Sequence, residues 1–317
     1  MSEMFTPVRI EPSVDDILRQ ELAQGDAVIG TIAPILRHLL ANDDQSLFND
    51  EIVARVRGMI DHIARQVLDA VEDAQGLARR EHAVETIAHV VSALVEQAAL
   101  LSHVHALALE FQLAERLQAR IALDPVLSPL LQALIASPDS ATAASAMTLL
   151  TAQARFIQSQ RRMQLPLGDL PADLFHGVLL VLRSVEAEGD VLVKAEAKLR
   201  GGFDEGRSRL GLMSRLVIGM GGGATAALAI GHAGVGLFLT AVSLGAGQDR
   251  DVTALAAHEG QLARLALALR ASGMRPEGVE EQFLAIHPDI SLPEGFSALG
   301  ADRAAALLAQ SFVGSGR

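Results

Sequence analysis

The stretch LVIGMGGGATAALAIGHAGVGLFLTAVSLGAGQ, residues 216–248, decides the structural class of this chain. It runs for 33 positions without Asp, Glu, Lys or Arg, and nine of those positions are glycine. Three structures fit such a stretch: a membrane span, a dinucleotide-binding turn between a strand and a helix, or buried helices that meet at glycine corners. The pattern within the stretch and the rest of the chain distinguish among them.

A membrane span is disfavoured by the position of a histidine. Residues 224–242 form the most apolar window, with seven strongly apolar side chains, but His232 lies almost at its centre. An ionisable group in mid-bilayer costs roughly the few kcal/mol that those apolar side chains contribute towards insertion. The chain also has no Trp or Tyr for an interfacial belt. We expect a soluble protein, and contact of residues 216–248 with a membrane surface stays open.

The dinucleotide-binding alternative rests on Gly219–Ala224, which fits the pattern G-x-G-x-x-A. In a Rossmann unit these glycines follow a strand and let a pyrophosphate approach a helix N-terminus. Leu216–Ile218 would be that strand, and Asp249 would be the acidic residue that binds the ribose. Asp249 lies 30 positions after Gly219, where about 20 is usual. A dinucleotide-binding oxidoreductase is therefore an alternative function that requires a β-sheet around Val217.

Buried helices fit the stretch best, because glycine ends helices and lets them pack closely. We predict helices over 209–220, 224–230 and 234–244, with corners at Gly221–Gly223 and at Gly245 and Gly247.

Composition supports a helical protein. Half of the 317 residues are hydrophobic, and the ten aromatic residues are all Phe, so the core is mainly aliphatic. The net charge of −12 disfavours nucleic acid as a partner, and Arg155, Arg161 and Arg162 are interpreted as a helix surface. The absence of cysteine excludes thiolate chemistry, and the N-terminus lacks a secretory signal. We expect a cytoplasmic protein.

The first third of the chain predicts a helical bundle over 13–122 after a flexible tail, 1–12. Ser13 and Asp16 form a capping box that opens a short helix, and a second helix over 27–40 contains Pro34 as a kink. Residues 35–124 contain no proline and only two glycines, which favours long helices. Two antiparallel helices are expected to meet near Gly76, and a third to run from Ser102 to about residue 122. Their apolar stripes follow three-and-four spacing at Ile52, Val56, Met59, Ile63, Val67 and Ala70, and at Val84, Ile87, Val91, Leu94, Ala98 and Leu101.

The remainder predicts an array of shorter helices over 124–312. Asp124-Pro125 is typical of a helix start, and the turn Ser137-Pro138-Asp139 makes residues 130–150 similar to one HEAT-type hairpin. Residues 165–171 mark a boundary. Further helices are expected at 172–184, 251–258, 261–271, 278–286 and 301–311.

Histidines are the only candidates for chemistry. His82, Glu85 and His89 have the spacing of one helix face, but they lack a recognisable fourth ligand, and we predict no metal site. His62, His82 and His89 on long helices keep a histidine phosphotransfer module open as an alternative function. No catalytic residue and no cofactor-binding residue are predicted.

Three segments resemble an uncharacterised all-helical family of alphaproteobacteria, a domain of unknown function. They are RRMQLPLGDLPADLFHGVLLVLR at 161–183, GVGLFLTAVSLGAGQDRDV at 234–252 and LARLALALRASGM at 262–274. The resemblance implies an all-α, partly HEAT-like architecture in a bacterial cytoplasm, and it brings no catalytic residues.

Together these patterns predict an all-α protein with a non-enzymatic binding or scaffold function, with a role in bacterial signalling as one expectation. Stacked helices would present a groove to a protein partner. Alternatively, the stripe over 84–101 would pair with a second copy to form a homodimer.

Overall fold

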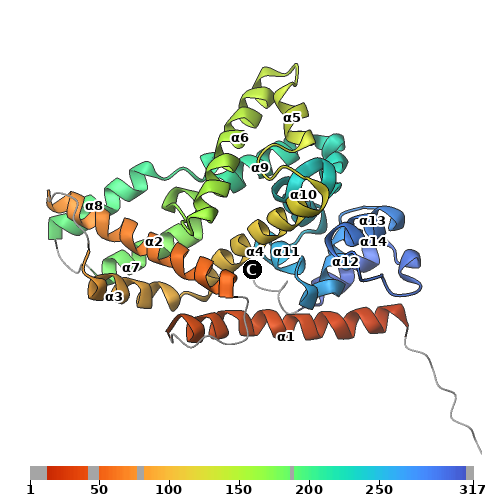
Figure 1. Ribbon diagram of the computed structural model, residues 1–317, viewed down its shortest axis with the longest axis horizontal. Helices are drawn as coiled ribbons and strands as arrows, with labels where there is room; N and C mark the ends of the chain where they lie inside the picture. Colours follow the sequence, from red (N-terminus) through yellow and green to blue (C-terminus); the bar gives the residue numbers. More distant parts are fainter. Residues whose placement is uncertain (1–12, 42–49, 77–81, 186–188, 312–317) are drawn as a thin grey trace, which may run out of the picture.

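The computed structural model describes residues 13–41, 50–76, 82–185 and 189–311, and it contains no strand within these ranges (Figure 1). This confirms the predicted all-α class. The predicted tail, 1–12, lies outside the described residues. The α-helices are α1 (Val14–Ala41), α2 (Asp50–Gln75), α3 (Val84–Val95), α4 (Ala98–Ile121), α5 (Pro129–Ile135), α6 (Ser140–Arg161), α7 (Ala172–Val185), α8 (Gly189–Gly202), α9 (Arg209–Gly219), α10 (Ile230–Ala246), α11 (Arg250–Ala256), α12 (Leu262–Ala271), α13 (Pro276–Ile286) and α14 (Ala301–Ala309). Short 3-10 helices are η1 (Leu167–Asp169), η2 (Glu205–Arg207), η3 (Gly221–Leu228), η4 (Glu259–Gln261) and η5 (Phe296–Ala298).

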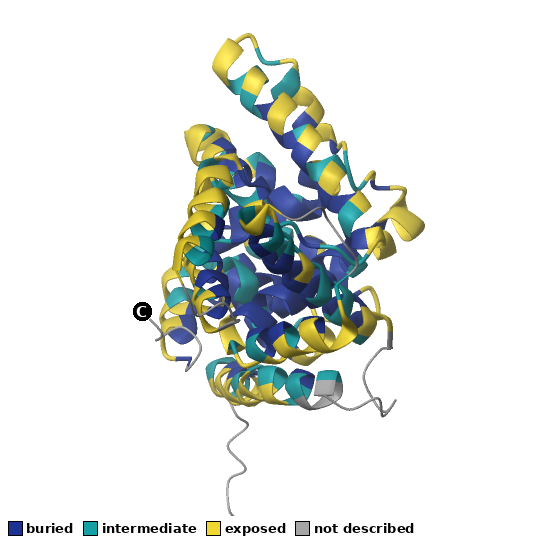
Figure 2. Ribbon diagram, turned by 90° about the vertical axis from the view of Figure 1, so that its left-hand side faces the viewer, coloured by how far each residue is buried: buried dark blue, intermediate teal, exposed yellow. Residues whose placement is uncertain are grey.

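The helices enclose two hydrophobic cores, which Figure 2 shows as the dark interior. One core gathers α2, α3, α7 and α8, and the other gathers α5 and α9 to α14. Three helices contribute to both: α1 through Leu22 and Leu36, α4 through Leu113 and Leu107, and α6 at its two ends. The cores therefore differ from the predicted division into 13–122 and 124–312. Each of these helices is long enough to pass from one core into the other.

Helix α1 is one helix where the sequence predicted two. Its start is confirmed, because the backbone N–H of Asp16 donates to the Ser13 hydroxyl and that hydroxyl donates to Asp16 at 2.7 Å. Pro34 lies inside the helix without ending it. Leu22 and Leu36, on either side of the proline, are buried in different cores. Because the helix is packed on both sides of Pro34, it stays helical there although proline lacks the N–H for the usual backbone hydrogen bond.

The stripe predicted over 84–101 is broken in the structure. Helices α3 and α4 meet at 96°, and Gln97 between them is extended, with its side-chain amide donating to the Gly177 carbonyl at 3.0 Å. Ser102 is consequently inside α4 and not at its start, which corrects the prediction. Ile87, Leu94 and Leu101 are buried in the chain's own core, so the surface proposed for a second copy is already covered. By contrast, the stripe on α2 is buried as predicted, and Gly76 turns the chain with φ +73°.

The helical hairpin of α5 and α6 projects from the body of the molecule (Figures 1 and 2). Asp139 caps α6 by accepting from Thr142 N–H at 2.9 Å, which confirms the predicted turn. The predicted helix start at Asp124-Pro125 is wrong by one turn. Asp124 caps a bend, accepting from the N–H groups of Val126 and Leu127, and α5 begins after Ser128.

The uncharged stretch forms the end of α9, η3 and α10, which are packed helical segments as predicted. Gly221 makes a corner with φ +52°, but the predicted corner at Gly245 is wrong, because Gly245 lies inside α10. Gly234 has φ +75° and kinks α10, and Gly247 ends it with φ +62°. Val217 lies in α9, so the strand that the dinucleotide-binding alternative requires is a helix. In the described part of the chain, no single helix has both the length and the hydropathy for a membrane crossing. The pairs α3–α4 and η3–α10 pass that test only jointly, and they bend by 96° and 114°.

Candidate functional site

A buried group of ions joins α4, α9 and α11 in the middle of the molecule. Arg209 donates two hydrogen bonds to the carboxylate of Glu110, at 2.7 and 2.9 Å, and Arg250 Nη2 lies 3.0 Å from Glu110 Oε2. Burial raises the pKa of Glu110, and the charges of Arg209 and Arg250 lower it by more, to about 2. Glu110 is therefore an anion at neutral pH, held between two cations.

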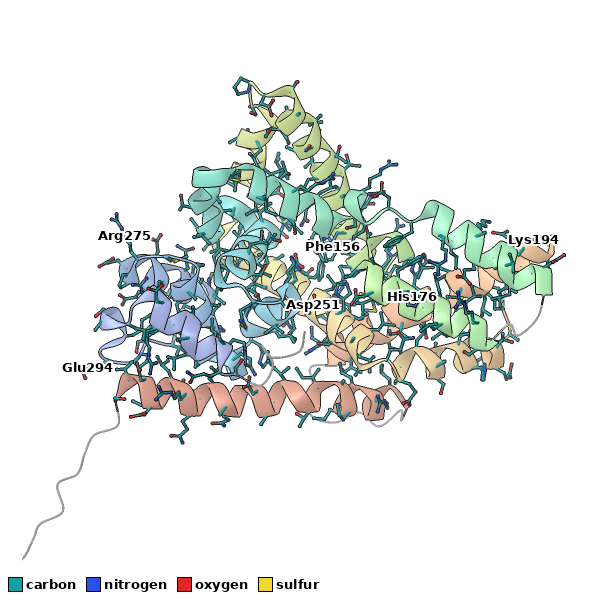
Figure 3. All side chains as sticks on the ribbon, turned by 180° about the vertical axis from the view of Figure 1, so that it is seen from behind. Phe156, His176, Lys194, Asp251, Arg275 and Glu294 are labelled. Atoms are coloured by element: carbon teal, nitrogen blue, oxygen red, sulfur yellow. The ribbon has the colours of Figure 1, made fainter. Side chains whose placement is uncertain are left out.

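The same group extends to a histidine and to an aromatic ring. His103 Nδ1 lies 2.7 Å from Asp251 Oδ2, and the guanidinium of Arg209 stacks 3.6 Å over the ring of Phe156. Figure 3 shows Phe156 and Asp251 near the centre of the molecule. Glu110 thus faces two arginines, and the side chains of Glu110 and Arg209 are 2% and 3% exposed. We interpret this group as a structural link between the two cores.

A pocket with different chemistry lies under α1, and we call it the α1 pocket. Its volume is about 310 Å³, within the size range of small-molecule sites. One side is the middle of α1, and the other side comes from α2, α4, α11 and η4; of these, α1 contacts α2, α4 and η4 directly. The lining is mainly aliphatic, and none of the described lining residues carries a carboxylate, an amine or a guanidinium group. It consists of Val28, Ile29, Thr31, Ile32, Ile35, Ile52, His105, Leu109, Gln112, Leu255, His258 and Gln261.

His105 is the unusual residue of the α1 pocket. Its side chain is on α4, its relative exposure is 7%, and its Nδ1 has no hydrogen-bond partner among the described residues. Burial and then the nearby His258 lower the pKa of His105 to about 4. The pocket therefore presents a neutral imidazole at pH 7. A buried polar atom without a partner normally costs stability, and it calls for an explanation such as a bound molecule.

Helix α1 closes this pocket because it is held on both sides of it. On one side, Gln261 donates to the Gly25 carbonyl at 2.7 Å, and Arg264 pairs with Asp26. On the other side, Leu36 is buried and Arg37 donates to the Val95 carbonyl. Between these contacts, residues 26–35 contain no fully buried side chain. The middle of α1 is thus a cover fixed at its two ends.

The histidines singled out in the sequence do not form one site. His89 and Glu85 are exposed on α3, whereas His82 precedes α3 and packs against α2. The predicted shared helix face of His82, Glu85 and His89 is therefore wrong, because the helix begins two residues after His82. His62 lies on α2 with Nδ1 2.9 Å from the Leu165 carbonyl oxygen.

His82 instead lies between two carboxylates of α2. Its Nε2 is 2.8 Å from Asp69 and its Nδ1 is 3.3 Å from Glu72, and one ligand atom from each of the three lies within 4.8 Å of the others. Both ring nitrogens already have a carboxylate partner. We interpret this cluster as a polar contact that attaches His82, which precedes α3, to α2.

Sequence reasoning found the helices that form the α1 pocket but not the pocket. The spacing of Ile29, Ile32 and Ile35 on α1 and of His105, Leu109 and Gln112 on α4 places each set on one face. A histidine and a glutamine on an otherwise apolar face were the available signal. That the two faces oppose one another follows only from the tertiary structure.

No protein family, curated protein or solved structure matches this chain.

Proposed function

We propose that this protein is a non-enzymatic helical binding protein whose site is the α1 pocket. Its ligand is a small, largely apolar molecule with one hydrogen-bonding group. The observation that carries the proposal is His105, a neutral imidazole with an unpartnered Nδ1 among aliphatic side chains. A ligand hydroxyl or carbonyl would pair with this imidazole, and the aliphatic lining would bind the rest of the molecule through burial of apolar surface.

The size and charge of the α1 pocket narrow the class of ligand. A volume of about 310 Å³ corresponds to about ten water-sized groups at roughly 30 Å³ each. With no charged side chain in the described lining, an ionised ligand head group would lose its hydration without gaining a counter-ion. A neutral medium-chain alcohol has the chemistry that the pocket accommodates.

We further propose that occupancy of the α1 pocket is communicated to a protein partner through α1. Helix α1 contacts both cores and the pocket, and its outer face is exposed. A bound ligand would change how tightly the middle of α1 packs against the rest of the protein. This would fit a scaffold role in signalling, in the cytoplasm, for which the absence of cysteine is the supporting argument.

The experiment uses the absence of Trp and Tyr from the chain. In a Val28→Trp variant the emission reports only the pocket rim, because Val28 lines the pocket and is 46% exposed. The variant is titrated with 1-octanol and with octane. We expect the tryptophan emission to change saturably with both ligands. The apparent Kd should be about fivefold lower for the alcohol, which is the equivalent of a hydrogen bond of about 1 kcal/mol.

Two further variants make this test specific. His105→Leu in the reporter background should remove the preference for the alcohol, and Leu109→Phe should weaken both ligands by narrowing the pocket. The matched control is Leu150→Phe, a half-buried leucine of α6 outside the pocket lining, which should bind as the reporter does. A response that does not saturate, or a preference that survives His105→Leu, would reject the proposal.

A further inference from the structure

A second depression, of about 400 Å³, lies on the surface between α6 and the segment that joins α8 to α9. In Figure 1 that segment passes alongside α6. Its chemistry is opposite to that of the α1 pocket, since its lining is mainly polar and contains three arginines. We call it the arginine pocket; it is lined by Thr148, Arg155, Gln158, Ser159, Arg162, Pro166, Gly168, Asp169, Gly202, Asp204 and Arg207.

The three arginines converge on this depression from two separate segments. Arg155 lies on α6 and Arg162 is its C-cap, seven residues or about two turns later, so the two lie near the same side of the helix. Arg207 comes from η2, at the opposite wall. All three are exposed, so each guanidinium is accessible to a solute.

None of these guanidiniums makes an ion pair within the described part of the chain. The chain has 38 acidic and 26 basic residues, so carboxylates are plentiful. Some other arginines are paired at short range, such as Arg183 with Glu196 at 2.7 Å. Three unpaired arginines gathered around one hollow in an acidic protein indicate a place where negative charge is supplied from outside.

The two carboxylates in the lining are already engaged by backbone groups. Asp204 Oδ1 accepts from Gly206 N–H at 3.0 Å and so caps η2. Burial raises the pKa of Asp169, while Arg209, Arg155 and a hydrogen bond from the backbone N–H of Arg209 oppose that shift. Asp169 feels the charge of Arg155, but among the described residues neither carboxylate forms an ion pair with Arg155, Arg162 or Arg207. They leave the arginines available.

Stabilisation of a helix end does not account for the cluster. Cations near a helix C-terminus interact favourably with the helix dipole, and this accounts for Arg161 and Arg162 at the end of α6. Arg155 lies nearly two turns earlier, beyond the reach of that effect. Arg207 belongs to a different element.

We propose that the arginine pocket binds a small anion that carries phosphoryl groups, with Arg155, Arg162 and Arg207 holding the phosphate oxygens. Guanidinium groups match phosphate oxygens with paired, charge-assisted hydrogen bonds. Ser159 and Gln158 add neutral polar groups from the same wall. The pocket volume suits a phosphorylated small molecule, and the net charge of −12 opposes the approach of a polyanion such as RNA.

The test is isothermal titration calorimetry of the full chain with sodium pyrophosphate as the probe, at low ionic strength. Arg155→Gln and Arg207→Gln should each raise the Kd for pyrophosphate by about tenfold or more, as expected for loss of a charge-assisted hydrogen bond. Arg161→Gln is the matched control. It removes the same charge from the same helix, but Arg161 does not line the pocket. The Kd of this variant for pyrophosphate should therefore stay within about twofold of the value for the unchanged protein.

Three outcomes would refute the proposal. They are an absence of heat from pyrophosphate binding, an equal loss of affinity in all three variants, and tighter binding of a single-stranded RNA oligomer than of pyrophosphate. Circular dichroism of each variant establishes that it is folded. Because all three arginines are exposed, a variant at one of them is expected to fold, and Arg162→Gln serves as the second test if another does not.

Discussion

Arg209 and Glu110 are 99 positions apart in the chain, and they form the most complete ion pair in the described interior: two hydrogen bonds, of 2.7 and 2.9 Å, between buried side chains. Arg209 also stacks on Phe156 of α6. The pair therefore ties α9 to α4 and α6, two of the three helices that pass between the cores. This arrangement makes it the contact on which the relation of the two cores depends.

Removing one charge from this pair should destabilise the protein strongly. In Glu110→Gln the side chain keeps its size, but Arg209 and Arg250 lose the buried carboxylate that they share. We expect the free energy of unfolding to fall by about 3–5 kcal/mol, measured by urea denaturation. The control is Arg183→Gln in an exposed ion pair, which should unfold close to the unchanged protein. Equal effects of the two substitutions would contradict the structural role of Glu110.

The stability of the protein should depend on His105 between pH 6.5 and 4. The pKa of His105 falls from 6.5 in the unfolded chain to about 4 in the native state, so the unfolded chain binds the extra proton in that window. Stability due to neutral His105 is present above pH 6.5 and is lost as the pH falls to 4. The loss is on the order of 3 kcal/mol by linkage.

His105→Leu should remove this part of the pH dependence. Urea denaturation of both proteins at intervals from pH 7 to pH 4 checks it, and the difference between their unfolding free energies should change across the window. Parallel curves would show that His105 already has a protonated or partnered state in the native protein.

Two helix-interior glycines should respond to alanine with opposite signs. At Gly30 of α1 no atom lies within 4 Å of the added Cβ, so Gly30→Ala should stabilise by about 0.5–1 kcal/mol through helix propensity. At Gly58 of α2 the Cβ would lie 2.6 Å from Met163 Cβ and 2.9 Å from the Met163 carbonyl oxygen. Gly58→Ala should lower the melting temperature, and thermal unfolding of the two variants measures both effects.

The chain should be monomeric at micromolar concentration. The stripe that suggested a homodimer contributes Ile87, Leu94 and Leu101 to the chain's own core, and Val84, at 77%, is its one large aliphatic residue that is exposed. Light scattering should give a mass near 33.5 kDa. A stable dimer would mean that a different surface mediates self-association.

Local patterns in the chain were enough to predict the helical class and many helix ends. Three-and-four spacing located α2, and capping residues located the starts of α1 and α6. Glycine corners located α9 and α10. These signals act within one or two turns of a helix, so they are readable without knowledge of any partner element.

Contacts between distant segments decided everything that bears on function. Gln97 bends α3 from α4 because its side chain reaches Gly177, 80 positions away, and His103 meets Asp251 at a separation of 148. The α1 pocket likewise needs α1 to lie across α4 and α11. Periodicity reports which face of a helix is apolar, but the packing of whole helices determines what that face meets. For this reason the all-α class was predictable from the residues, and the α1 pocket, the arginine pocket and the Glu110 ion pair emerged only with the tertiary structure.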